Sequence, residues 1–196
     1  MKLIGLTGSI GAGKSAVSDW LRAQGVAVHD ADAAVHEIYR WPEMVVWFAY
    51  HFPGVMMSGK LDKQKLAEII FANPDLKTKL ESVVHPAVAD HRANFITAAE
   101  ARDESIVVCD IPLLFETGAE NMLDEVWLVT APVDVRRTRV MEREHMTAEK
   151  FDRINAAQMS DEEKRTRAHV VIENDGTIEE LREKLSEKLS CLIGKK

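Results

Sequence analysis

Eight residues near the start of the chain have the composition and order of a phosphate-binding loop. Gly8-Ser9-Ile10-Gly11-Ala12-Gly13-Lys14-Ser15 matches the pattern GxxxxGK[ST], after a short apolar run and before a helical pattern. Glycines let consecutive backbone N–H groups turn toward a phosphate, and the following helix adds its positive N-terminal end. The loop predicts a nucleoside triphosphate site, with Lys14 on the β- and γ-phosphates and the Ser15 hydroxyl as a Mg²⁺ ligand. The alternative, a glycine-rich turn that only joins strand to helix, explains few of the eight matching positions.

The loop alone does not determine which reaction follows. A signalling GTPase needs an NKxD-type motif that recognises guanine after a later strand, and the sequence contains none. A motor or helicase is normally longer than 196 residues. The size therefore favours a small-molecule kinase, in which one appended segment holds the acceptor and an arginine-rich lid excludes water during transfer.

Carboxylates stand at the ends of two predicted strands, where α/β sheets bind their ligands. Asp30 and Asp32 lie at the end of the second strand, and a carboxylate there can accept the proton of a hydroxyl acceptor. The alternative role for Asp32 is the N-cap of a helix from Ala33 onward, and the spacing favours neither role. Asp110 ends the apolar run Ile106–Cys109, as in a Walker-B strand that holds Mg²⁺ directly or through water. Its alternative is a turn residue at the strand end.

Four arginines share one helical pattern: Arg136, Arg137, Arg139 and Arg143. Arg139 and Arg143 are four residues apart and therefore share a helix face. Guanidinium groups on that face can clamp a phosphoryl group in transfer and neutralise its charge. The alternative is a solvated helix paired with its own glutamates, and spacing alone favours that alternative.

Two shorter motifs mark the ends of elements. His85-Pro86 interrupts a helical pattern, which predicts a helix boundary, with a functional role for His85 as the alternative. Asn174-Asp175-Gly176 is a turn signal after the last strand pattern, at the sheet edge where a nucleotide base can rest.

The elements that must position these side chains alternate between strand and helix patterns. A capping box at Thr177 and Glu180 begins a final helix with one apolar face. Five short runs rich in β-branched residues indicate buried parallel strands: Lys2–Thr7, Val26–Asp30, Ser105–Asp110, Glu125–Thr130 and Ala168–Glu173. We therefore expect an α/β fold, a P-loop NTPase core with a five-stranded parallel sheet flanked by helices.

A long insertion interrupts the alternation between the second and third strands. It contains helical patterns and no convincing strand, and Asp62 is expected to cap one of its helices. Pro86 is expected to kink or divide a long helix that follows Pro74. The run Met44–Met57 is expected to form core between insertion helices, with a groove for an extended apolar ligand as the alternative.

These patterns predict three parts. The helical insertion would hold the acceptor, and a second helical segment, rich in arginine, would form a lid. The predicted boundaries are 1–32, 105–131 and 168–196 for the nucleotide-binding core, 33–104 for the acceptor domain and 132–167 for the lid.

Composition excludes several classes of protein. The 32 acidic and 25 basic residues give a net charge of −7, which argues against general nucleic-acid binding. No apolar run approaches the ~18 residues of a membrane span. Two cysteines are too few for a disulfide scaffold and fit a reducing compartment, so we expect a cytoplasmic protein. The sequence does not determine an oligomeric state.

Taken in order, the motifs resemble those of the dephospho-CoA kinase family. The likeness runs through IGLTGSIGAGKS at 4–15, DADAAVHE at 30–37, HP at 85–86, VVCDIPLLFE at 107–116, Arg139 with Arg143, RINAAQ at 153–158 and VIENDG at 171–176. The phosphate loop is common to many NTPases, whereas DAD followed by DIPLLFE is much more specific. One departure is Trp41–Phe52, which is more aromatic than is usual in the family.

The resemblance implies an ATP- and Mg²⁺-dependent kinase that phosphorylates the ribose 3′-hydroxyl of dephospho-CoA. It implies that Asp32 is the base facing that hydroxyl, that Arg139 is a lid arginine on the ATP phosphates, and that Asn174 lies near the adenine. It also implies that His85 belongs to the acceptor pocket. The implied ATP-binding residues of the loop are Gly11, Ala12, Gly13, Lys14, Ser15 and Ala16, and the implied metal ligands are Ser15 and Asp110.

Two other classes of function stay open. One is a kinase for another small hydroxyl or monophosphate acceptor. The other is a nucleotide-binding regulatory module without catalysis, and Asp32 together with the arginine helix argues against it.

Overall fold

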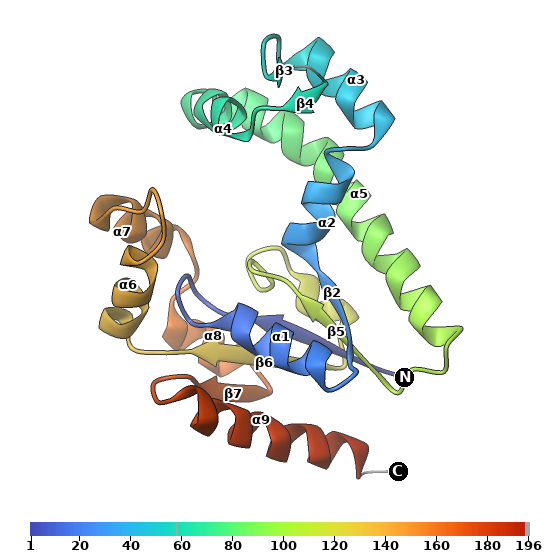
Figure 1. Cartoon of the computed structure of the whole chain (residues 1–196), viewed down its shortest axis with the longest axis vertical. Helices are drawn as coiled ribbons and strands as arrows, with labels where there is room; N and C mark the ends of the chain where they lie inside the picture. Colours follow the sequence, from blue (N-terminus) through green and yellow to red (C-terminus); the bar gives the residue numbers. More distant parts are fainter. Residues whose placement is uncertain (58, 195–196) are drawn as a thin grey trace. The chain divides into compact units, whose positions relative to one another are not determined.

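The computed structural model describes residues 1–57 and 59–194, and the chain forms two compact units (Figure 1). One unit contains Met1–His29 and Ala99–Lys196, and the other contains Asp30–Ala98. The second unit is therefore inserted into the sequence of the first, after its second strand.

The first unit is built on a five-stranded parallel sheet, as the sequence predicts. Its strands are β1 (Lys2–Thr7), β2 (Ala27–Asp30), β5 (Ile106–Asp110), β6 (Glu125–Thr130) and β7 (Val170–Glu173). The strand order is β2-β5-β1-β6-β7, so β1 is central. Because parallel strands end at one common edge, the loop after β1 emerges between the ends of β5 and β6, where such sheets bind ligands.

Two helices cover one face of this sheet: α1 (Lys14–Ala23) and α9 (Ile178–Ile193). Val17 of α1 joins Leu181 and Leu185 of α9 in one buried cluster with alternate strand residues. The predicted capping box of α9 is present, since Thr177 accepts from the backbone N–H of Glu180 and Glu180 accepts from that of Thr177. Capping and apolar burial thus hold the two helices against the strands that carry the loop.

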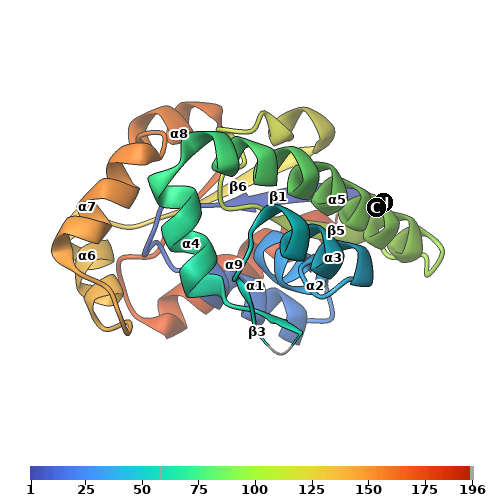
Figure 2. The same cartoon turned by 90° about the horizontal axis from the view of Figure 1, so that it is seen from above.

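The arginine-rich segment between β6 and β7 is helical, as predicted, and belongs to the same unit as the sheet. It contains α6 (Val133–Met141), α7 (Ala148–Ala157) and α8 (Asp161–Arg167), which follow one another in Figure 2. A short 3₁₀ helix, η1 (Ala119–Met122), precedes β6. A capping box between Ser160 and Glu163 starts α8.

The second unit is mostly helical and has its own core. Its helices are α2 (Ala31–Ile38), α3 (Pro42–His51), α4 (Lys63–Ala72) and most of α5 (Pro74–Glu100). Met44, Phe48 and Phe52 lie in its buried cluster, so much of the aromatic run forms core as expected. Asp62 caps α4, also as expected, by accepting the N–H of Lys65 at 3.0 Å.

Two expectations for the insertion are wrong. It contains a small antiparallel hairpin, β3 (Met56–Met57) with β4 (Lys60–Leu61), whose strands are too short to show an alternating pattern. Pro86 lies inside α5, so the division of the helix and the helix boundary expected at His85-Pro86 are wrong. Proline has no backbone N–H, so one hydrogen bond of the helix is missing at Pro86. The helix continues because Val84 and Val88, on either side of the proline, pack on the core of this unit.

Within the described part of the chain, no helix combines the length and apolar character that a membrane crossing requires.

Candidate active site

The phosphate loop joins β1 to α1, and two of its glycines allow its shape. Gly11 and Gly13 have φ angles of 81° and 94°, a region that other residues rarely adopt. A Cβ at Gly11 would lie 2.5 Å from the carbonyl oxygen of Arg136, and one at Gly13 would lie 2.0 Å from Nδ2 of Asn174. Gly13 is also the N-cap of α1, so the loop ends at the positive end of a helix, which favours a bound anion.

Asp110 lies beside this loop and pairs with its lysine. The parallel register sets Asp110, the last residue of β5, next to Leu6 of β1. Asp110 is 2% exposed, forms an ion pair with Lys14, and accepts the hydroxyl of Ser18 at 2.5 Å. A buried carboxylate with these partners does more than end a strand, because it forms an ion pair with the lysine of the loop.

The donor set predicted for Mg²⁺ fits that ion. Ser15 is exposed in the first turn of α1 and supplies a hydroxyl, while Asp110 supplies a carboxylate. Mg²⁺ prefers oxygen donors and in kinases takes one or two protein ligands together with phosphate oxygens and water. Ala16 follows in α1 and packs partly buried against the core of the sheet.

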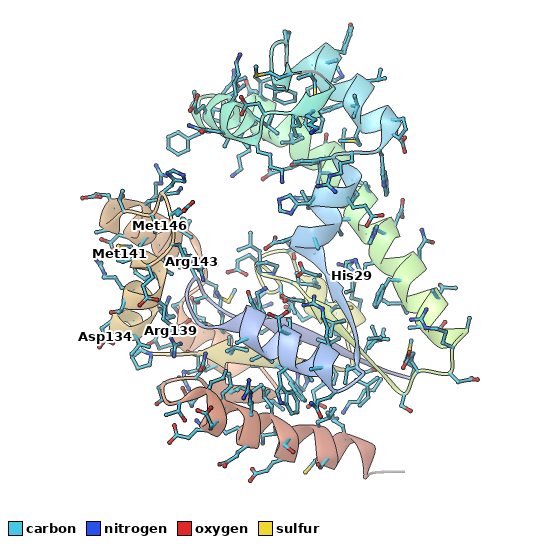
Figure 3. All side chains as sticks on the ribbon, in the orientation of Figure 1. His29, Asp134, Arg139, Met141, Arg143 and Met146 are labelled. Carbon is cyan, nitrogen blue, oxygen red and sulfur yellow. The ribbon has the colours of Figure 1, made fainter. Side chains whose placement is uncertain are left out.

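Arg139 and Asn174, both predicted to contact the nucleotide, meet at the loop. Nη1 of Arg139 donates to the backbone carbonyl of Asn174 at 2.9 Å. Nδ2 of Asn174 donates in turn to the carbonyl of Ala12 at 2.8 Å. Arg139 lies on α6 and the exposed Arg143 lies just beyond its end (Figure 3). The loop, the end of β7 and the arginine helix are therefore connected through two hydrogen bonds.

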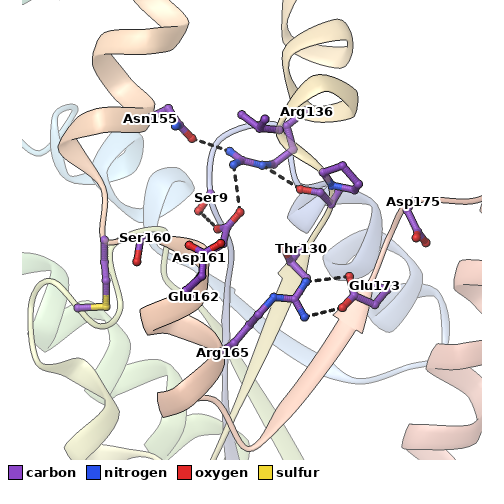
Figure 4. A pocket seen from close by; sticks show the side chains of 14 residues that line it. Ser9, Thr130, Arg136, Asn155, Ser160, Asp161, Glu162, Arg165, Glu173 and Asp175 are labelled. Carbon is purple, nitrogen blue, oxygen red and sulfur yellow. Dashed lines mark hydrogen bonds and ion pairs between the residues drawn. The ribbon is translucent and has the colours of Figure 1, made fainter.

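Arg136 is buried beneath the loop, and is not part of a solvated helix face. Its side chain is 5% exposed, and Nη2 forms an ion pair with Oδ2 of Asp161 at 3.0 Å. Nη1 donates to the carbonyl of Ile10 at 3.2 Å and to Oδ1 of Asn155 at 2.7 Å. Nε donates to the carbonyl of Ala131 at 3.1 Å. As Figure 4 shows, the guanidinium group is occupied by partners within the protein.

The residues at the end of α7 and in α8 also hold the loop. Oε1 of Gln158 accepts the backbone N–H of Ile10 at 2.9 Å. The hydroxyl of Ser9 donates to Oδ1 of Asp161 at 2.5 Å and lies 3.1 Å from Nζ of Lys164. Two consecutive loop residues are thus tied to the helical segment through their backbone and side-chain polar groups.

A pocket of about 420 Å³ opens next to this network (Figure 4). One part of its lining is the pair Arg136–Asp161, and another is the pair Arg165–Glu173, joined by hydrogen bonds of 2.6 and 3.1 Å. The hydrogen bond to Glu173 raises the pKa of the Arg165 guanidinium above its ordinary value. The charged groups on the pocket walls therefore pair largely with one another.

The carboxylates after β2 begin the second unit and differ in role. Asp30 is the N-cap of α2, because its Oδ1 accepts the N–H of Ala33 at 3.0 Å. The capping alternative for Asp32 is therefore wrong, since the helix begins at Ala31 and Asp32 is an exposed residue of its first turn. His85 is exposed near the middle of α5. The proton-accepting role of Asp32 stays a prediction, and the alternative role as a helix cap is excluded.

Several residues of the site are absent from the sequence-based prediction. Ser18, Asp161 and Lys164 contact the loop or its carboxylate, and Lys164 is fully buried with an ion pair to Glu116 at 3.4 Å. The capping pattern at Ser160 indicates where α8 begins. No local sequence pattern, however, indicates that Lys164 contacts Ser9, which lies 155 residues away in the sequence. Three further residues of this network do lie in motifs that carry the family resemblance: Asn155 and Gln158 in RINAAQ, and Glu116 in DIPLLFE.

A family model and the curated relatives of this chain agree on one family. A family model described as dephospho-CoA kinase matches residues 2–180. A curated dephospho-CoA kinase of Bartonella henselae is 43% identical over 193 residues, which cover 98% of this chain and 99% of that protein. A solved Thermus thermophilus protein has a TM-score of 0.84 and 39% identity, covering 97% of both chains. The solved dephospho-CoA kinase from Campylobacter jejuni has a TM-score of 0.75 and 25% identity over all of both chains.

Proposed function

We propose that this chain, which belongs to the dephospho-CoA kinase family, transfers the γ-phosphoryl group of ATP to the ribose 3′-hydroxyl of dephospho-CoA. The products are coenzyme A and ADP, and the reaction is the final step of coenzyme A biosynthesis. The observation that carries the proposal is the phosphate loop, with Lys14 paired to the buried Asp110, in a chain that the family model matches over residues 2–180. A cytoplasmic location is part of the same proposal.

On the nucleotide side, the chain supplies positive charge and hydrogen-bond donors. Lys14, Arg139 and the N-terminus of α1 stabilise negative charge on the phosphates as the γ-phosphoryl group leaves. The hydrogen bonds from Arg139 to Asn174 and from Asn174 to Ala12 support a shared role for these residues around the nucleotide, with Asn174 near the adenine. Ser15 and Asp110 would hold Mg²⁺, which would supply positive charge to the phosphates during transfer.

On the acceptor side, Asp32 orients the 3′-hydroxyl and accepts its proton. The hydroxyl oxygen forms a bond to the γ-phosphorus while the bond from that phosphorus to the β-bridging oxygen breaks, and ADP leaves with the electron pair. Because phosphoryl transfer has a loose transition state, much of the contribution of Asp32 is orientation of the oxygen. His85 contributes to the acceptor pocket in this proposal.

The structure offers a matched pair of variants to test Asp32. Asp30→Asn and Asp32→Asn make the same chemical change two residues apart, and asparagine caps helices about as well as aspartate. We expect Asp30→Asn to keep α2 intact by capping it. Asp32→Asn should keep the melting temperature and ATP affinity but lower phosphoryl transfer by roughly 10²- to 10⁴-fold, with the lower end expected. Unchanged turnover in Asp32→Asn would remove Asp32 from the mechanism.

A panel of acceptors distinguishes the remaining classes of function. ADP release is measured with dephospho-CoA, with simple hydroxyl compounds and with nucleoside monophosphates. Preferred use of another acceptor would indicate a different kinase specificity. ATP binding without ADP release for any acceptor would indicate a nucleotide-binding regulatory module.

A further inference from the structure

The carboxylate of Asp110 uses its two oxygens for two different partners. Oδ1 forms the ion pair with Nζ of Lys14, and Oδ2 accepts the hydroxyl of Ser18 at 2.5 Å. The side chains of Lys14 and Asp110 are 17% and 3% exposed, and the hydrogen bond from Ser18 is buried. One oxygen is therefore directed to the lysine of the phosphate loop, and the other is held within the protein.

Ser18 occupies a place on α1 that an apolar residue could fill. It is 1% exposed, and the neighbouring Val17 and Leu21 belong to the buried cluster of the sheet unit. Alanine is a better helix former than serine and carries no polar group, whereas a buried hydroxyl needs a hydrogen-bond partner. The chain therefore places a hydroxyl in its core at some cost to the helix, and Asp110 is the group that this hydroxyl binds.

Lys14 cannot hold Asp110 throughout the reaction. In the proposed function its ammonium group stabilises the phosphates of the nucleotide, so its pair with Oδ1 of Asp110 weakens when the nucleotide binds. Oδ1 is then the carboxylate oxygen available as a metal ligand. The terminal torsion of an aspartate has no sharply preferred angle, so a carboxylate without a second partner would turn. The hydroxyl of Ser18 is such a second partner, and it does not depend on the nucleotide.

We propose that Ser18 is a positioning residue for the metal-binding carboxylate. Its hydroxyl holds Oδ2 of Asp110, so that Oδ1 faces the phosphate loop whether or not Lys14 is paired with it. Ser15 and Ser18 are three residues apart on α1, so one rigid helix carries both the hydroxyl predicted to bind Mg²⁺ and the hydroxyl that orients Asp110. The inference rests on the proposed function, in which Ser15 and Asp110 hold Mg²⁺.

A serine outside the site provides the matched control. Ser18→Ala removes the hydroxyl, and Ser18→Thr keeps it. Ser186→Ala makes the same change as Ser18→Ala at an exposed position of α9 in the same unit. Thermal unfolding of each variant is measured first. We expect all three to be folded, because each differs from the parent by a single hydroxyl or methyl group.

ADP is then titrated calorimetrically into each protein, once with Mg²⁺ and once with a chelator in its place. The ratio of the two dissociation constants measures how strongly nucleotide and metal support each other on the protein. In Ser18→Ala this ratio should fall about 10-fold, while the Kd for metal-free ADP stays within about two-fold of the parent value. Loss of a partner of a metal ligand lowers metal affinity by roughly 10- to 100-fold, and the lower end applies because phosphate oxygens also hold the metal. Ser18→Thr and Ser186→Ala should keep the parent ratio.

Steady-state kinetics gives a second measure, which a merely structural role would not produce. In Ser18→Ala, the Mg²⁺ concentration that gives half-maximal turnover should rise about 10-fold. The KM for dephospho-CoA should stay within about two-fold of the parent value, because the acceptor does not depend on Asp110.

Four results would overturn the assignment. They are an unchanged ratio in Ser18→Ala, an equal fall of its affinity for ADP with and without Mg²⁺, the same fall of the ratio in Ser186→Ala, and a folded Ser18→Thr that behaves as Ser18→Ala. A Ser18→Ala protein that does not fold would also overturn it, because the hydroxyl would then serve the fold. The titration needs no acceptor, so absence of transfer to dephospho-CoA in the parent protein would refute the proposed function while the ratio still judges Ser18.

Discussion

Replacement of Arg136 by methionine tests the polar network that supports the phosphate loop. Methionine keeps a long apolar side chain but removes the guanidinium group, and with it the hydrogen bonds to Ile10, Asn155 and Ala131 and the ion pair with Asp161. The Arg136 and Asp161 side chains are 5% and 17% exposed, so the loss leaves a carboxylate and two carbonyl groups with fewer partners in a poorly solvated place.

The size of the effect follows from that burial. Removing one partner of a buried ion pair costs about 3–5 kcal/mol. Arg137 is the control, because it is the next residue of the same helix and pairs with Asp152 where the two side chains are 43% and 56% exposed. An exposed pair contributes about 0–1 kcal/mol, and the contact of Arg137 with the ring of Phe151 adds about 0.5–1 kcal/mol.

Thermal unfolding measured side by side gives the result. In a chain of this size, 1 kcal/mol corresponds to roughly 2–4 °C, so Arg136→Met should lower the melting temperature of the sheet unit by about 6–20 °C. Arg137→Met should lower it by no more than about 8 °C, and by less than Arg136→Met in the same experiment. At a temperature where both variants are folded, Arg136→Met should also raise the KM for ATP, because Ile10 loses a partner. Equal melting shifts and equal KM values would refute the assigned role of Arg136.

Three further predictions concern single side chains. Lys14→Ala should keep the fold but lower turnover at least ~10²-fold, because the positive charge that Lys14 places on the phosphates is lost. Near-normal steady-state turnover would contradict the proposed contact of Lys14 with the phosphates. Arg139→Ala should depress kcat more than ATP affinity, whereas Arg137→Ala should be tolerated, and similar kinetics for the two variants would contradict a role of Arg139 on the phosphates. Burial opposes ionisation of Glu125, but hydrogen bonds from Lys2 and Trp127 prevail and lower its pKa below the ordinary 4.5. Its ionised form therefore stabilises the fold above pH 4.5 and loses that effect as the pH falls through the lowered pKa. Glu125→Gln should cost about 1 kcal/mol in urea unfolding at pH 7 and less at pH 3, and a loss independent of pH would contradict this origin.

The sheet and the phosphate loop were predictable because their determinants are local. A buried parallel strand is an apolar, β-branched run, and each of the five predicted runs forms a strand within two residues of its expected bounds. The loop after β1 requires glycine where φ is positive, and Gly11 and Gly13 satisfy that need within a short motif. The capping boxes are local for the same reason, since the side chain and the N–H group that it accepts are three residues apart.

The small hairpin and the continuous helix through Pro86 were not predictable by the same rules. The two strands of the hairpin have two residues each, which is less than one full period of alternation on a face. Pro86 breaks a local rule, and packing of Val84 and Val88 on a core assembled from distant residues decides the outcome. In both cases the determining contacts are tertiary.

The buried charges beneath the loop show the same limit at the site itself. In the sequence, Arg136 and Lys164 belong to charged helical segments that resemble solvated faces, and the structure buries both. Their partners, Ile10 and Ser9, lie 126 and 155 residues away in the sequence. The helical period of a sequence shows which residues share a helix face, but it does not show which distant parts of the chain pack against that face.

The chemistry of the loop explains why charged residues occupy that buried place. A phosphate loop turns several of its backbone N–H groups toward the ligand, so carbonyl and hydroxyl groups such as those of Ile10 and Ser9 are directed elsewhere and need donors. Apolar side chains beneath them would leave these oxygens unsatisfied, at about 1–3 kcal/mol each. Arg136 and Lys164 supply the donors, and Asp161 and Glu116 balance their charge. The same requirement that makes the loop bind phosphate therefore selects a polar, paired layer behind it, and it ties the loop to the arginine-bearing helices.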